Sequence, residues 1–279
     1  MQIAQELIET TERIAHSIEL PVIEEIILPR PDSPQIHDAE FAAICLQDGS
    51  MGFFYTLLDD TMQRLHAEID ADAWRGKSPI MLARHYGEPD PLARSMGLGA
   101  ISAVTQHLFR ISWYEPDTQT NSMAKMAFSP TDHIGMVGYF PPLVERLREQ
   151  GVRLCVIEKR AEFVQQGDLF RVTLDPRALR DCNKILCTAA TLLNDSLDEI
   201  LAHCGHAQRV AVIGPTAGCL PDPLFSRGVD AVGGSRTANP VSLKQRLRDQ
   251  LEWADAVEKY TIERDNYPGF DQLLLRASR

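Results

Sequence analysis

The order of apolar and polar positions between Asp132 and Lys159 predicts a strand, a tight turn, a helix and a second strand. The apolar run that begins at Ile134 is typical of a buried parallel strand. Apolar side chains then recur at helical spacing after Pro142, which suits the first turn of a helix, and Gly151 is a natural stop. We therefore expect this stretch to form a βαβ unit.

Downstream segments continue to alternate between strand-like and helix-like patterns, which indicates an α/β fold with a parallel sheet and helices on both faces. A helix is expected to end near Gly205, and an amphipathic helix is expected over Val241–Tyr260. The expected strands after the first are Arg153–Ile157, Gly167–Leu174 as a short or edge strand, Lys184–Thr188, Arg209–Ile213 and a short last strand, Gly228–Val232.

The first half of the chain has a different pattern. After an opening amphipathic helix, three strands are expected at Val22–Leu28, Phe41–Leu46 and Gly52–Leu57, the last two joined by an Asp-Gly turn. Helical spacing then continues through residues 59–110. We expect two domains: a smaller α+β domain over 1–120, and an α/β domain over 121–279 with a C-terminal helix and tail. Trp113–Thr131 would form the connection.

Composition narrows the classes of partner. The net charge of −11, with no basic block to offset it, argues against nucleic acid and against anionic membranes. The sequence has no apolar run long enough to span a membrane, and its start lacks a signal-peptide pattern. The six cysteines are expected to be reduced core thiols. We therefore expect a cytoplasmic protein with a small-molecule ligand, and a homodimer is left open.

The candidate site lies where the parallel strands end, because ligands collect at the carboxyl edge of such sheets. Glu158 follows Gly138 by twenty positions, the usual offset for a carboxylate that binds a ribose hydroxyl. The turn between them is not G-x-G-x-x-G, however. Pro141 and Pro142 stand where free amides would contact a pyrophosphate, and this disfavours an ordinary dinucleotide site.

Three loops, formed by residues 138–142, 188–194 and 214–218, should meet at this edge together with Glu158. Polar residues in these loops suggest a ligand pocket. Thr191 and Asn194 have an alternative role as caps of the following helix. Small residues at 97–103 either face this pocket or allow close helix packing, and we favour packing. The candidate ligand-binding residues are Gly138, Tyr139, Phe140, Pro141, Thr188, Thr191, Asn194, Gly214, Pro215 and Thr216.

These motifs carry a family resemblance. The sequence resembles the "putative heavy-metal chelation" family in five motifs, taken in order as Gly135-Met-Val-Gly-Tyr-Phe-Pro-Pro-Leu, Val156-Ile-Glu, Thr188-x-x-Thr-Leu-Leu-Asn, Ile213-Gly-Pro-Thr and Gly228-Val-Asp. Ser102 and the Ala189-Ala190 pair depart from the family pattern. The resemblance implies an enolase-amino-terminal-like domain followed by a Rossmann-like domain. It also implies a site between them that handles a metal or metal chelate.

The residues alone give little support for a bound metal ion. Cys182 and Cys187 have the wrong spacing for a zinc knuckle, and the His203–His206 cluster falls at a helix end where histidine and glycine are common. His107 and His133 have no partner in sequence. We favour a protein that binds or forms a metal chelate, with Glu158 as ligand carboxylate or general base. An enzyme with an S-adenosylmethionine or nicotinamide cofactor and a non-catalytic scaffold are the alternatives.

Overall fold

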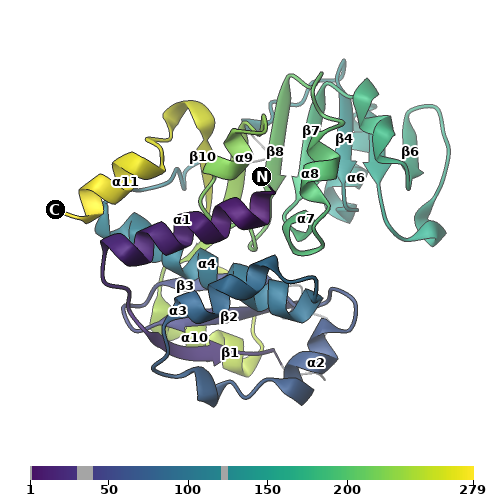
Figure 1. The fold of residues 1–279 in the computed structure, drawn as a ribbon. Helices are drawn as coiled ribbons and strands as arrows, with labels where there is room; N and C mark the ends of the chain where they lie inside the picture. The colour runs from purple at the N-terminus through teal and green to yellow at the C-terminus, as the bar shows by residue number, and fades with distance from the viewer. Residues whose placement is uncertain (1, 30–39, 121–124) are drawn as a thin grey trace.

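The computed structural model describes residues 2–29, 40–120 and 125–279. Figure 1 shows two separate sheets with helices packed around and between them. The smaller sheet is antiparallel with the order β1-β2-β3, and a turn with Gly49 at φ +87° joins its last two strands. Its strands are β1 (Ile23–Ile27), β2 (Phe41–Leu46) and β3 (Met51–Tyr55).

The larger sheet has seven strands in the order β10-β9-β8-β7-β4-β5-β6. Every neighbouring pair is parallel except β9 and β10. The prediction of separate antiparallel and parallel sheets is thus confirmed, with one antiparallel strand at an edge. The strands are β4 (His133–Val137), β5 (Arg153–Ile157), β6 (Phe170–Thr173), β7 (Lys184–Thr188), β8 (Arg209–Ile213), β9 (Ala231–Thr237) and β10 (Val257–Glu263).

Helices cover both faces of the larger sheet. Ile134 and Met136 pack with Leu147 of α6 (Pro141–Glu149) on one face. Val137 packs with the opposite layer, which contains Leu193. This alternation explains why the strands are apolar throughout their length. That second layer contains α7 (Ala190–Leu193) and α8 (Leu197–Leu201), and α9 (Asp222–Phe225) follows β8.

Two helices lie between the sheets. The 21-residue helix α4 (Pro91–Ile111) packs on β3 and also contacts α7, so it borders both sheets. Helix α1 (Ile3–Ser17) crosses beside it, as Figure 1 shows. Other helices are α2 (Thr61–Glu68), α3 (Pro79–Ala83), α11 (Phe270–Ala277) and the 3₁₀ helices Asp72–Trp74, Arg84–Gly87, Ala161–Phe163, Pro176–Asp181, Ala254–Ala256 and Arg264–Asn266.

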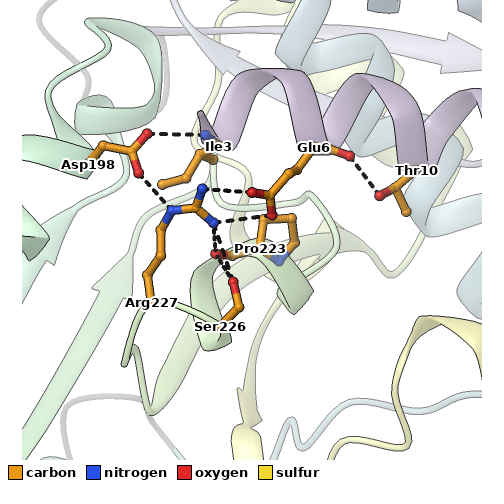
Figure 2. Close-up of polar contacts among 7 residues, drawn as sticks. All are labelled: Ile3, Glu6, Thr10, Asp198, Pro223, Ser226 and Arg227. Carbon is orange, nitrogen blue, oxygen red and sulfur yellow. Dashed lines mark hydrogen bonds and ion pairs between the residues drawn. The ribbon is translucent and has the colours of Figure 1, made fainter. Parts of the chain in front are cut away.

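Arg227 fixes the start of α1 against the larger sheet (Figure 2). Its guanidinium is 2.8 Å from Glu6 Oε1 of α1 and 2.7 Å from Asp198 Oδ1 of α8. The second oxygen of Asp198 accepts a hydrogen bond from the amide of Ile3 at 3.1 Å. The acidic side chain thus satisfies one of the unpaired amides of the first helical turn.

The C-terminal part corrects two predictions. The helix expected over Val241–Tyr260 is wrong: α10 (Pro240–Asp249) ends after ten residues, and strand β10 follows. Gln250 adopts a left-handed conformation at φ +57°, and the amide of Leu251 bonds back to the carbonyl of Arg246 at 2.9 Å. This helix C-cap lacks the glycine that usually marks one, so no stop is visible in the local residue pattern.

The strand expected at Gly228–Val232 is also misplaced, because β9 runs over Ala231–Thr237 and is not the last strand. It pairs with β10 over seven positions. Gly233 and Gly234 lie in the middle of β9, and glycine is uncommon inside strands. A Cβ at Gly234 would lie 2.4 Å from the Tyr260 hydroxyl, so the neighbouring strand's ring requires glycine there.

Residues 240–256 pack on the smaller sheet rather than the larger one. Leu243 and Leu247 of α10 join Phe41 and Phe53 in one core cluster. Trp253 stacks on Phe53 with ring centroids 4.7 Å apart. The smaller sheet is therefore covered by α4 on one face and by this segment on the other.

Candidate functional site

The strand order places a topological switch point between β4 and β7. From β4 the chain proceeds to β5 and β6 on one side, whereas β7 leads to β8 and β9 on the other. The connections after β4 and β7 consequently diverge to opposite faces: α6 covers one face and α7 the other. Such divergence leaves a crevice at the carboxyl ends of the strands, where open α/β sheets bind their ligands.

Two glycines let three of the predicted loops come together at this edge. Gly138, directly after β4, has φ +86°, and a Cβ there would lie 3.0 Å from Thr188 Cγ2 at the end of β7. Gly214, directly after β8, has φ +142°, and a Cβ there would lie 3.1 Å from Ala189 Cβ. Other residues rarely adopt these backbone angles, so both conformation and space require glycine.

Glu158 follows β5 and is half-buried at the same edge. Its backbone amide bonds to the carbonyl of Thr173 at 3.0 Å, which fixes the strand end. The carboxylate accepts a hydrogen bond from the amide of Lys159 at 2.7 Å. Within the described ranges, Glu158 makes no ion pair, so its negative charge is available to a ligand.

An aromatic pair stands beside Glu158. The rings of Tyr139 and Phe163 are stacked, with centroids 5.7 Å apart and planes 13° apart. The guanidinium of Arg160 lies 4.1 Å from the centre of the Phe163 ring. Phe163 and Arg160 were not predicted from sequence. They follow the end of β5, and the loop after a parallel strand is the general position at which to look for such residues.

The turn into α6 offers no amides to an anion. Phe140 is the N-cap residue, and Pro141 and Pro142 occupy the first helical positions without an N–H. The next two amides, of Leu143 and Val144, both donate to the carbonyl of Phe140, at 3.0 and 2.9 Å. This helix start therefore lacks the phosphate-binding device of a dinucleotide site.

Thr188, Thr191 and Asn194 use their polar atoms mainly within their own loop. The Thr191 hydroxyl donates to the carbonyl of Thr188 at 2.7 Å, and Thr188 Oγ1 accepts from the amide of Ala190 at 3.3 Å. Asn194 Oδ1 accepts from the Ser196 amide at 3.2 Å and from its hydroxyl. Asp195, at φ +57°, breaks the expected single helix into α7 and α8. A ligand role for these three side chains stays a prediction.

The loop after β8 faces helix α4. Thr216 is only 2% exposed. A Cβ at Gly218 would lie 2.9 Å from Ser102 Cβ, so loop and helix are in direct contact. The Ser102 hydroxyl is buried without a partner among the described residues.

The small residues of α4 allow close packing, which was the favoured interpretation. A Cβ at Gly97 would lie 2.4 Å from the backbone of Tyr86, and one at Gly99 would lie 2.6 Å from the Phe54 ring. A Cβ at Gly52 in β3 would lie 2.0 Å from the carbonyl oxygen of Gly99. Helix and sheet thus meet backbone to backbone.

Sequence reasoning missed Arg94, which joins α4 to the loop after β7. Its guanidinium, 7% exposed, donates to the carbonyls of Leu193 at 3.0 Å and Leu192 at 3.3 Å. It also pairs with Asp195 at 2.9 Å and lies 4.9 Å from the centre of the Tyr86 ring. These are the unpaired carbonyls that end α7. An arginine at the start of a run of small and apolar residues was the available signal.

His107 and His133 have structural partners. His107 lies 2.8 Å from Asp48, and His133 lies 2.7 Å from the carbonyl of Asp181. All six cysteines are buried and free of disulfides, and the Cys204 thiol donates to the carbonyl of Ile200 at 3.2 Å. Over residues 2–29, 40–120 and 125–279, no three histidine, cysteine or acidic side chains cluster as metal ligands.

Two surface cavities lie away from the strand ends. One of about 500 Å³ lies between α1, α9 and α11, and its lining includes Glu6 and Phe270. Another of about 670 Å³ lies between β1 and α10, and its lining includes Glu25 and Lys244. Neither contains a predicted site residue. None of the helices in the described part of the chain is long and apolar enough to cross a bilayer.

Several known proteins are similar to this chain in sequence or in fold. An uncharacterised protein of Methanocaldococcus jannaschii is 25% identical over 180 residues, a match that covers 62% of this chain and 67% of that protein. A crystal structure from Desulfitobacterium hafniense has a TM-score of 0.69 at 18% identity and covers 93% of this chain and 99% of its own. One from Pyrococcus horikoshii has a TM-score of 0.63 at 19% identity and covers 92% and 99%.

Both crystal structures belong to one family, DUF364, and both have unknown function. At these identities they show a shared fold. The model of the same family, described as "Putative heavy-metal chelation", matches residues 122–261, which is half of this chain. The chain therefore belongs to the putative heavy-metal chelation family, DUF364.

Proposed function

We propose that this protein binds a small metal chelate in the crevice at the carboxyl ends of β4 and β7, opposite helix α4. The observation that carries the proposal is the reversal of strand order between β4 and β7. The proposal takes the larger sheet as Rossmann-like and the smaller unit as enolase-amino-terminal-like, as the resemblance implies. The metal in this proposal is taken from the description of the family, heavy-metal chelation.

The donor atoms at this edge favour a metal that arrives with its own organic ligands. Heavy metals prefer thiolate and imidazole. The groups that we propose as ligand contacts are instead the carboxylate of Glu158, the hydroxyl of Thr216 and the side-chain amide of Asn194. These groups do not fit a bare heavy-metal ion. They fit the organic part of a chelate, which they would bind by hydrogen bonds, while Glu158 would attract its positive charge.

A nucleotide-like cofactor is the second candidate, and the stacked rings of Tyr139 and Phe163 favour it. Such a pair offers a flat surface to a planar base, and Glu158 stands where a ribose hydroxyl would bind. The prolines that begin α6 oppose a pyrophosphate. Among these cofactors, S-adenosylmethionine fits better than a nicotinamide dinucleotide because it has no phosphate.

A thermal-shift screen separates the candidates. The probes are Ni²⁺ and Cu²⁺ as free ions, the same ions as ethylenediamine and histidine chelates, S-adenosylmethionine and NAD⁺. A ligand at a hundredfold excess over its Kd stabilises the native state by about 2.7 kcal/mol. We expect a shift with a chelate that exceeds the shift with the free ion.

Variants then locate the binding. Glu158→Gln and Thr216→Val should weaken binding by about 1.5–3 kcal/mol, because each leaves a ligand group without its partner. Glu199→Gln, an exposed glutamate on α8, is the matched control and should bind as the wild type does. Equal shifts for ion and chelate, or full binding by Glu158→Gln, would exclude the proposed site. A shift with S-adenosylmethionine alone would favour the second candidate.

A further inference from the structure

Cys155 and Cys182 are brought together by a gap in the sheet at Gly135. Gly135 of β4 is the lateral neighbour of Cys155 on β5 and of Ile185 on β7. A Cβ at Gly135 would lie 3.2 Å from Cys182 Cβ and 2.7 Å from Leu179 Cδ2. The Cys182 side chain, at the end of the 3₁₀ helix 176–181, therefore fills the space beside Cys155. Neither thiol belongs to the site proposed above.

A guanidinium contacts the first of these sulfurs. Arg171 on β6 is the next lateral neighbour of Cys155, and its Nε donates to Cys155 Sγ at 3.1 Å. The same guanidinium lies 3.6 Å from Asp181 and is partly exposed. Cys155 is thus a fully buried thiol whose hydrogen-bonding partner reaches the surface.

We propose that Cys155 and Cys182 form a redox pair, in which Cys155 is the peroxide-sensitive nucleophile and Cys182 the resolving thiol. The thiolate is the reactive form of cysteine, and a neighbouring cation together with a second thiol stabilises it. The neighbouring Cys182 thiol and the Arg171 guanidinium lower the pKa of Cys155, against the opposing effect of burial.

The pKa values of the other cysteines are shifted in the opposite direction. Burial raises the pKa of Cys45, Cys204 and Cys219 to about 12, and that of Cys187 well above its ordinary value. Cys204 contributes to the raised pKa of Cys187, and no cation is among the causes. These two buried thiols provide an internal control.

The chemistry needs one hydroperoxide. The Cys155 thiolate attacks a peroxide oxygen, the O–O bond breaks, and hydroxide leaves to give the sulfenic acid. The Cys182 sulfur then attacks the sulfenyl sulfur, forms the S–S bond and releases the hydroxyl group, which leaves as water with the Cys182 proton. Two electrons pass from the thiol pair to the peroxide. A thiol reductant restores both thiols by exchange. Peroxide would reach the pair by local opening of residues 176–181, a short 3₁₀ helix with exposed positions.

Hydrogen peroxide on the folded, full-length chain tests the proposal. After a timed exposure, free thiols are alkylated under unfolding conditions and the peptides are mapped by mass spectrometry. We expect a Cys155–Cys182 disulfide, reversed by dithiothreitol, while Cys187 and Cys204 stay alkylated. Cys182→Ser should stop at a Cys155 sulfenic acid that dimedone traps. Arg171→Gln should slow oxidation of Cys155 at least tenfold, and Arg209→Gln, at the start of β8, should leave the rate unchanged.

The proposal is overturned if all six thiols remain alkylated, or if Cys187 and Cys204 are oxidised as fast as Cys155. An unchanged rate in Arg171→Gln would remove the role of the arginine. Circular dichroism of each variant checks folding. Because the disulfide map and the internal control come from the wild type, the proposal can be refuted even if a variant fails to fold.

Discussion

At the scale of single residues, Arg94 shows how one side chain connects the two halves of the molecule. A buried charge is costly unless its hydrogen bonds are satisfied. Here two helix-terminal carbonyls and Asp195 satisfy it, and the Tyr86 hydroxyl shares one of the carbonyls at 2.9 Å. The arginine therefore holds the loop after β7 in position against α4.

Arg94→Ala should lower the free energy of unfolding by about 2–4 kcal/mol, because it leaves buried carbonyls unpaired and opens a cavity beside Tyr86. Urea unfolding followed by circular dichroism measures this. Arg13→Ala is the control, since Arg13 and its partner Asp271 are both well exposed, and should cost less than about 1 kcal/mol. Equal effects of the two substitutions would contradict the structural role of Arg94.

At the scale of elements, the contact of α4 with β3 depends on glycine facing glycine. Gly52 and Gly99 bring helix and strand backbones closer than any side chain would allow. This close approach places the rest of α4 against the loop that contains Gly218. The position of α4, which forms one wall of the proposed site, therefore depends on Gly52 and Gly99 having no side chain.

Gly52→Ala should destabilise the protein by about 1–3 kcal/mol or more, because the added methyl group meets backbone atoms that cannot rotate away. Gly205→Ala places the same methyl group where no atom lies within 4 Å, and should change stability by about 0.5 kcal/mol or less. Thermal denaturation of the two variants compares them. A stable Gly52→Ala protein would show that helix and strand can separate without cost.

At the scale of the whole molecule, the C-terminal segment joins the two sheets. The chain leaves β9, covers the smaller sheet with α10 and Trp253, and returns to the larger sheet as β10. A single core cluster also contains residues of both sheets, among them Ile44 and Val212. Shared burial of this kind should make the sheets unfold together.

Leu243→Ala should therefore destabilise the entire chain by about 2–4 kcal/mol, although Leu243 of α10 packs on the smaller sheet. Val241→Ala on the same helix is the control, because Val241 is 81% exposed. Tryptophan fluorescence and far-ultraviolet circular dichroism should shift to the same lower urea midpoint. A second transition seen by circular dichroism and unaffected by the substitution would show instead that the larger sheet unfolds independently.

Elements whose pattern is local could be predicted from the residues alone. The strands Arg153–Ile157, Lys184–Thr188 and Arg209–Ile213 were predicted with the bounds that the structure has, and so was the hairpin at Gly49. Each is a short apolar run between clear turn residues, so the information needed lies within a few positions. The contacts of the loops at Gly138 and Gly214 with the loop after β7 were expected from parallel topology alone.

The other features depend on contacts between residues that lie far apart in the chain. The helix ends at Asp195 and Gln250 use left-handed backbone without glycine. Arg94 pairs with groups about a hundred positions away in the chain. The strand order, with its reversal beside β4, depends on which strands pair. The physical reason is the same in each case. Periodicity along a chain shows which side of an element is buried, but the partner that buries it, and the angles it imposes, come from residues distant in sequence.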